Sequence, residues 1–142
     1  RVINMEKQNI RAVTTEQLGE LVDFISIDVA FISLDKVLPV ATTLLKDTGS
    51  LVALIKPQFE AGKEKVGKGG IVRDRAVHEE VLSRILQVAY DCKLYLHGLT
   101  FSPIKGTEGN IEFLGYFTKS EEGALSITDE LITAVVDEAH TL

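Results

Sequence analysis

Three charged residues, Asp28, Lys56 and Glu112, each border an apolar stretch of the chain. Asp28 and Lys56 follow stretches typical of buried strands, and Glu112 stands at the start of another. In open α/β sheets, ligands bind at the carboxyl ends of the parallel strands. An antiparallel strand begins at that same edge, so the three side chains are predicted to meet there. A lysine flanked by carboxylates can position or deprotonate a hydroxyl nucleophile, and the spacing leaves open which of the two Lys56 does.

Each of the three residues also has an ordinary structural explanation. Asp28 could cap the turn into the next helix, Lys56 could be a solvated strand end, and Glu112 could be an outward-facing strand residue. Their shared position at one predicted edge favours a catalytic role, because the strand pairing predicted below brings them together.

The elements that must position these residues alternate between strand and helix. Apolar stretches predict strands at 1–5, 24–28, 50–55, 93–101 and 111–118. Capping residues and helical spacing of apolar residues predict helices at 14–21, 33–46, 75–89 and 128–140. This order indicates a mainly parallel α/β sheet with helices on both faces. The loop between the last two strands is too short for a crossover helix, so this pair is predicted to be antiparallel.

The segment between the second helix and the third strand carries three further predictions. Pro39 is expected in the first turn of its helix, where a missing N–H is tolerated. Asp47, Thr48 and Gly49 are expected to end that helix, with Gly49 near the left-handed position. The nearly continuous apolar stretch 50–55 predicts a strand that is buried on both faces.

Composition is that of an ordinary globular domain, with two surfaces of opposite charge. Of the 142 residues, 45% are hydrophobic and 25% are charged, and the net charge is −6. Residues 119–142 contain one base and six acids, whereas residues 56–75 contain six bases and three acids in a Gly-rich setting. We therefore expect a main domain at 1–119 and an acidic tail with an amphipathic helix at 120–142.

Other features of the sequence argue against several classes of protein. No apolar stretch is long enough to span a membrane. The single cysteine, Cys92, excludes an intramolecular disulfide framework and suits a reducing, cytoplasmic location. His78 and His97 are expected on the surface or on a helix face, and His140 in solvent, with no pairing that would bind a metal. The chain begins inside a predicted strand, so we expect it to be part of a longer protein.

Several segments of the chain resemble the TlyA/hemolysin A family of FtsJ-like, S-adenosylmethionine-dependent RNA 2′-O-methyltransferases. They read IDVAFISL (27–34), VALIKPQFEAG (52–62), VGKGGIVRD (66–74), SPIKG (102–106) and EGNIEF (108–113). The likeness covers residues 1 to about 119. It implies a Rossmann-like methyltransferase fold of which this chain holds the C-terminal part, with the N-terminal strands of the sheet missing from it.

The resemblance also implies a role for each candidate residue. In a Lys-Asp-Lys-Glu catalytic set, Asp28, Lys56 and Glu112 match the last three members, and the first lysine would lie upstream. Gln8, Asn9 and Asp28 would contact S-adenosylmethionine, and no metal is needed. Phosphates of the RNA would be bound by Lys63, Lys65, Lys68, Arg73 and Lys105. A Gly-rich cofactor loop and an S4-type RNA-binding domain would also lie upstream, so we expect this chain alone to bind the cofactor weakly.

Two other functions are to be compared with ribose methylation. The family name suggests a membrane-active hemolysin, but the sequence has no membrane span and its last amphipathic helix is acidic. The second alternative is a non-catalytic RNA-binding module. The resemblance implies an enzyme that acts on ribosomal RNA or a ribosomal subunit, and the absence of a membrane span argues against action on a membrane.

Overall fold

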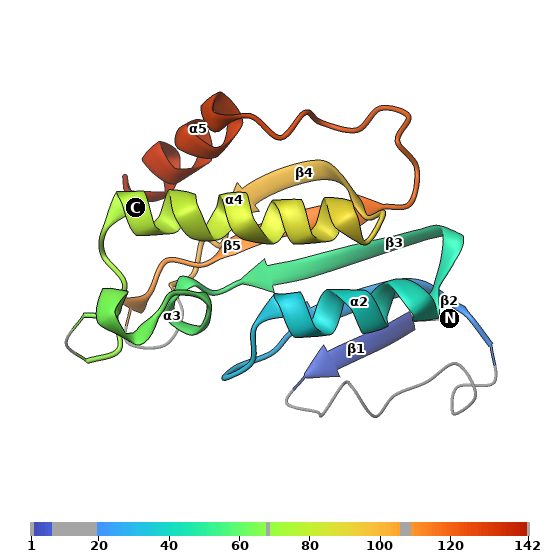
Figure 1. Cartoon of the computed structure of the whole chain (residues 1–142), viewed down its shortest axis with the longest axis horizontal. Coiled ribbons are helices and arrows are strands. Elements are labelled where there is room, and N and C mark those ends of the chain that lie inside the picture. Colours follow the sequence, from blue (N-terminus) through green and yellow to red (C-terminus); the bar gives the residue numbers. More distant parts are fainter. Residues whose placement is uncertain (1, 7–19, 68, 106–108, 142) are drawn as a thin grey trace.

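The computed structural model describes residues 2–6, 20–67, 69–105 and 109–141. Strands and helices alternate over most of this part of the chain (Figure 1). In chain order the elements are β1 (Val2–Glu6), β2 (Val22–Asp28), α2 (Leu34–Leu44), β3 (Leu45–Ile55), α3 (Pro57–Glu60), η2 (Lys63–Lys65), α4 (Arg75–Asp91), β4 (Tyr95–Phe101), β5 (Phe113–Thr118) and α5 (Asp129–Ala139).

The described strands form one sheet in the order β1-β2-β3-β5-β4. The pairs β1–β2 and β2–β3 are parallel, and β5 is antiparallel to both of its neighbours, β3 and β4. The prediction of an antiparallel last strand is therefore confirmed. Because β5 inserts between β3 and β4, its first residue lies beside the last residue of β3. This arrangement brings the segment before β5 to the edge where β2 and β3 end.

Helices α2 and α4 lie side by side over one face of the sheet (Figure 1). The residues of β3 that point to this face, Leu51, Ala53 and Ile55, are buried, while the alternate residues Val52 and Leu54 are only half-buried. The prediction of a strand buried on both faces is therefore wrong for the described residues. An apolar stretch predicts burial of a strand but does not say how completely each face is covered.

Helix α5 packs against α4 and β4 and contributes to the same core. Thr128 caps its first turn by accepting a hydrogen bond from the backbone N–H of Leu131. The apolar face of α5 is buried, and the acidic residues of its first turn are exposed. The apolar residues on that face are Ile132, Val135, Val136 and Ala139.

The join between α2 and β3 differs from prediction. Pro39 lies in the second turn of α2, and Leu44 is followed at once by β3 with no separate turn. Because Leu45 to Gly49 are part of the strand, Gly49 does not take a left-handed conformation. A side chain at Gly49 would approach the backbone oxygen of Asp23 to 3.0 Å and the Leu45 side chain to 2.5 Å. Close packing against the Leu45 side chain and the backbone of β2, and not a helix end, therefore explains this glycine.

Candidate active site

An ion pair joins the ends of the two parallel strands β2 and β3. Lys56 Nζ lies 2.5 Å from Asp28 Oδ1, and the lysine side chain is only 16% exposed, while the aspartate is 40% exposed. Asp28 is the last residue of β2, and Lys56 follows the last residue of β3. The sheet therefore holds a fixed ammonium group at its edge and leaves part of the carboxylate open to a ligand. Sequence reasoning predicted this pair, and the structure brings it together.

Glu112 lies at the same edge but has a different partner from the one expected. In the β3–β5 ladder Ile55 pairs with Phe113. Lys56 follows Ile55 and Glu112 precedes Phe113, so the two residues lie just beyond the same end of this antiparallel pair. Glu112 is buried, and its Oε2 accepts a hydrogen bond of 2.9 Å from Gln58 Nε2. No ion pair joins Lys56 to Glu112 among the described residues. The structure thus places all three predicted residues at one edge, but only Asp28 contacts the lysine directly.

Gln58 was not identified from the sequence as part of the site. Its Nε2 donates to Glu112, which fixes the orientation of the amide because the other orientation would direct Oε1 at a carboxylate. Its Oε1 is buried and has no hydrogen-bond partner among the described residues. A buried acceptor without a donor is costly in a folded protein, so this atom is a candidate contact for a hydroxyl or amino group of a ligand.

The carboxylate of Glu60 links the loop after β2 to helix α3 and to α4. Ser33 Oγ donates to Glu60 Oε1 over 2.5 Å, the backbone N–H of Leu34 donates to Oε2 over 2.8 Å, and Arg84 donates to Oε1 over 3.0 Å. The Glu60 side chain is only 2% exposed. Burial raises its pKa, and the donors from Ser33, Leu34 and Arg84 oppose that rise. Glu60 therefore connects the segments that carry Asp28 and Lys56.

Phe31 is the most exposed of the large apolar side chains in the described residues, at 89% exposure. Its φ angle is 64°, a conformation that costs energy for a bulky residue. The ring packs against Phe59 at a centroid separation of 4.7 Å. Phe31 follows Asp28 by three positions and Phe59 follows Lys56 by three, so the two packed rings belong to the segments that continue from the ion pair. The sequence motif contained Phe31, but its exposure could not be read from a stretch that looked apolar throughout.

The residues predicted to bind RNA are only partly brought together. Lys65 is paired with Glu80, at 2.7 Å to each carboxylate oxygen. Arg73 and Lys105 are exposed and border one cavity. The side chain of Lys63 and the whole of Lys68 lie outside the described residues, as do the predicted cofactor contacts Gln8 and Asn9.

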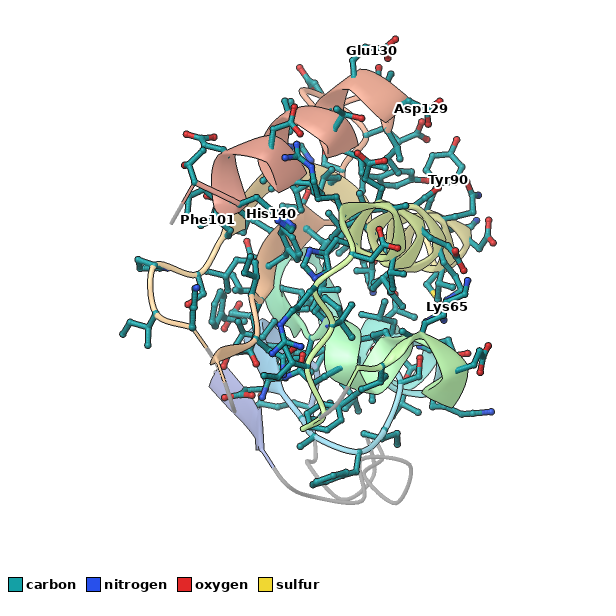
Figure 2. The ribbon with its side chains drawn as sticks, turned by 90° about the vertical axis from the view of Figure 1, so that its left-hand side faces the viewer. Lys65, Tyr90, Phe101, Asp129, Glu130 and His140 are labelled. Atoms are coloured by element: carbon teal, nitrogen blue, oxygen red, sulfur yellow. The ribbon has the colours of Figure 1, made fainter. Side chains whose placement is uncertain are left out.

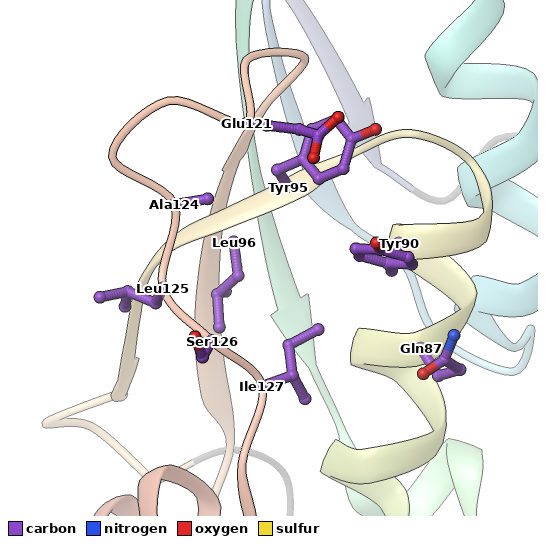
Figure 3. Close-up of a pocket in the computed structure, with 9 residues that line it drawn as sticks. All are labelled: Gln87, Tyr90, Tyr95, Leu96, Glu121, Ala124, Leu125, Ser126 and Ile127. Carbon is purple, nitrogen blue, oxygen red and sulfur yellow. The ribbon is translucent and has the colours of Figure 1, made fainter.

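Another cavity lies between α4, the start of β4 and the segment before α5 (Figure 3). Its volume is about 370 Å³, and Tyr90, Tyr95 and Glu121 are among the residues that line it. Tyr95 is the first residue of β4, whose direction is that of β3, so this cavity lies toward the opposite edge of the sheet. It contains none of the predicted catalytic residues.

With this geometry established, comparison with known proteins identifies the class of the domain. Residues 1–119 match the model of the FtsJ-like methyltransferase family. The fold, a mainly parallel sheet whose last strand is antiparallel, agrees with that match. The chain belongs to the FtsJ-like methyltransferase family.

Individual relatives place the chain more narrowly within that family. The chain is 47% identical over 147 residues to "Putative rRNA methyltransferase YqxC" of Bacillus subtilis, a comparison that covers 99% of the chain and 51% of the relative. It is 35% identical to "16S/23S rRNA (cytidine-2'-O)-methyltransferase TlyA" of Mycobacterium tuberculosis, covering 89% of the chain and 47% of that protein. A solved structure, "Putative hemolysin from Streptococcus thermophilus", superposes with a TM-score of 0.85 at 43% identity, covering 94% of this chain and 48% of the other. These names agree with the TlyA/hemolysin resemblance, and the chain spans about half the length of the relatives it matches.

Proposed function

We propose that the protein containing this chain transfers a methyl group from S-adenosylmethionine to a ribose 2′-hydroxyl of ribosomal RNA. The observation that supports it most strongly is the Lys56–Asp28 ion pair at the ends of β2 and β3 in a chain of the FtsJ-like family. The name of the Mycobacterium relative, a 2′-O-methyltransferase of ribosomal RNA, points to the same reaction. The proposal includes a cytoplasmic location, where ribosomal RNA is found.

In this proposal Lys56 positions the 2′-hydroxyl of the substrate. An ammonium group has three N–H donors, and Asp28 takes one of them, so the others are free to contact the hydroxyl oxygen. The sequence left open whether Lys56 is a base or a fixed cation, and the short ion pair with Asp28 favours the fixed cation. Glu112, held by Gln58, keeps a second carboxylate beside the lysine.

The described residues fit the cofactor at one point. Asp28 is 40% exposed while it is paired with Lys56, so its carboxylate is open to accept a hydrogen bond from S-adenosylmethionine. When bound, the cofactor supplies an electrophilic methyl group. The contribution of the protein is then alignment of the hydroxyl with that group, which is a major source of rate enhancement in transfer reactions.

The proposed RNA contacts are the basic residues of the loop after β3, together with Lys105. Arg73 and Lys105 are exposed at the edge of the sheet where β3 ends, and they would bind phosphates. Phe31, an exposed residue of the loop that follows Asp28, offers an aromatic surface on which a base can stack. Backbone contacts of this kind would give affinity that depends strongly on salt.

The rival function, membrane lysis, has less support. No helix in the described part of the chain is both long and apolar enough to cross a membrane. The amphipathic helix α5 buries its apolar face on α4 and β4 and exposes acidic residues. Neither property suits an anionic membrane surface.

The proposal is tested with the full-length protein, S-adenosylmethionine and ribosomal subunits that lack the modification. We expect a labelled methyl group to appear on a ribose 2′-oxygen, located by its resistance to alkaline cleavage. Release of dye from liposomes without methyl transfer would support the hemolysin instead. Binding of ribosomal RNA with no methyl transfer would support the non-catalytic RNA-binding module.

A further inference from the structure

A second basic cavity lies at the same edge of the sheet as the ion pair. Its volume is about 410 Å³, and Arg73, Lys105 and His140 are the charged or titratable residues among the described ones that border it. Ile111, which also borders it, directly precedes Glu112. Figure 2 looks onto the side toward which β3 points in Figure 1 and shows His140 on that side. The cavity is therefore close to the candidate active site and distinct from it.

Two histidines form a hydrogen-bonded chain behind this cavity. His78 is fully buried on α4, against the ring of Phe113, and its Nε2 lies 3.0 Å from the backbone oxygen of Val72. Its Nδ1 lies 2.8 Å from Nε2 of His140, at the end of α5. The prediction that His78 is a surface or helix-face residue is wrong as to the surface, because the carbonyl of Val72 and the ring of His140 satisfy both ring nitrogens in the core.

The chain of hydrogen bonds fixes the tautomers of the two neutral rings. A carbonyl can only accept, so His78 Nε2 carries its proton and Nδ1 is the acceptor. His140 Nε2 must then donate to His78 Nδ1. This leaves Nδ1 of His140 as an acceptor without a hydrogen-bond partner among the described residues, on a ring that borders the cavity. An anion can contact His140 Nδ1 only after that nitrogen has taken up a proton.

We infer that the cavity bordered by Arg73, Lys105 and His140 binds a phosphate group of the RNA backbone together with a proton on His140. This inference rests on the proposed function, since it names a contact of the same substrate. Three basic groups surround the cavity in the described residues, and single-stranded RNA supplies phosphates whose geometry an Arg fork and a Lys ammonium both suit. Helix α5, which provides His140, lies outside the residues 1–119 that match the family model.

The charges around His140 determine how binding depends on pH. Burial, Arg75 and Lys105 lower the pKa of His140, in that order of size, and Arg75 is itself paired with Asp137 on α5. The neutral ring of His78 adds no charge next to His140. The charge of Asp74 acts on His78, where it opposes the lowering of the pKa by burial. A bound phosphate would raise the pKa of His140 again. RNA affinity is therefore expected to rise as the pH falls between the pKa of the bound and of the free state.

The test uses the full-length protein with two probes, a single-stranded RNA dodecamer and inorganic phosphate, over a range of pH and salt. Arg73→Gln and Lys105→Gln should each weaken RNA binding roughly three- to tenfold and reduce the slope of log affinity against log salt by about 0.7. His140→Gln should abolish the pH dependence of binding. Lys46→Gln, which removes a charge from the opposite edge of the sheet, is the matched control and should leave affinity unchanged.

Nuclear magnetic resonance of the His140 ring gives a readout that does not depend on catalysis. A rise of the His140 pKa on adding the dodecamer supports the inference, and an unchanged pKa overturns it. In the binding measurements, a loss of RNA affinity in Lys46→Gln equal to that of the cavity variants also overturns it. A rise with inorganic phosphate alone, and none with the dodecamer, would identify a free-phosphate site and overturn the RNA assignment. If the wild type methylates RNA but the cavity variants bind normally, only this inference fails. If the variants weaken binding but no methyl transfer occurs, only the proposed reaction fails.

Discussion

The amide nitrogen of Gln58 donates to the carboxylate of Glu112 across 2.9 Å, and the amide oxygen of the same side chain is buried without a partner in the described part of the chain. Through this hydrogen bond Gln58, which lies two residues after Lys56, orients the second carboxylate of the site. We predict that Gln58→Leu lowers methyl transfer by about 10- to 100-fold, because Glu112 loses its donor. The free energy of unfolding should fall by about 1 kcal/mol, because the loss of the donor to buried Glu112 outweighs the removal of the unpaired oxygen.

The matched control for this prediction is Gln87→Leu. Gln87 makes a hydrogen bond to Asp91 on the exposed side of α4, away from the site. That variant should keep the wild-type rate. Methyl transfer by Gln58→Leu at the wild-type rate would show that Gln58 does not position Glu112.

Glu60 provides a second prediction, which concerns stability. Its buried carboxylate accepts hydrogen bonds from Ser33, Leu34 and Arg84, and Glu60→Gln would leave at least one of these donors without an acceptor. We expect the free energy of unfolding to fall by about 2 kcal/mol in chemical denaturation. Glu80→Gln, which removes an exposed carboxylate paired with Lys65, should leave stability unchanged within error. Equal stability of the two variants would refute the linking role of Glu60.

Phe31 combines an exposed ring with a φ angle of 64°. Phe31→Gly should therefore not destabilise the protein, and relief of the backbone strain can raise its free energy of unfolding by about 1 kcal/mol. Methyl transfer should fall about tenfold, because the variant loses one stacked base. Phe31→Leu keeps the strained backbone and removes the ring, so it should lose activity with no gain in stability. A stable, fully active Phe31→Gly variant would contradict the proposed contact with RNA.

The buried histidine predicts how stability depends on pH. Burial lowers the pKa of His78 below its ordinary value of 6.5, so the unfolded state binds a proton more readily than the folded state. Stability is therefore lost as the pH falls through 6.5 toward the folded-state pKa. His78→Gln should weaken this loss in denaturation experiments at several pH values. His97→Gln should retain it, because the His78 ring is still present. Identical pH profiles for wild type and His78→Gln would contradict this explanation.

Much of the fold followed from local patterns in the sequence. The sequence predicts correctly that two strands end at Asp28 and Ile55 and that a helix starts after Asp74, because apolar stretches and capping residues are local signals. The join between α2 and β3 is not predicted correctly, since the Leu45 side chain and the backbone of β2, which is distant in sequence, together leave no room for a side chain at Gly49. Predictions failed where a partner from another segment decided the structure.

The same distinction applies to the candidate site. Asp28, Lys56 and Glu112 were identified because strand ends can be counted along the chain. The hydrogen bond from Gln58 to Glu112, the linking role of Glu60 and the pairing of His78 with His140 depend on residues far apart in sequence. Residue type alone gives no sign of such partners, and the three-dimensional arrangement was needed to find them.

The measurement that tests the central claim most directly is methyl transfer to ribosomal RNA by the Lys56→Ala variant of the full-length protein. Affinity for S-adenosylmethionine is measured in the same samples, and Lys46→Ala serves as the control for loss of a lysine. Loss of the ammonium group held by Asp28 should lower the rate at least about 100-fold while cofactor affinity stays unchanged. A wild-type rate in Lys56→Ala would contradict the assignment of this ion pair as the catalytic centre.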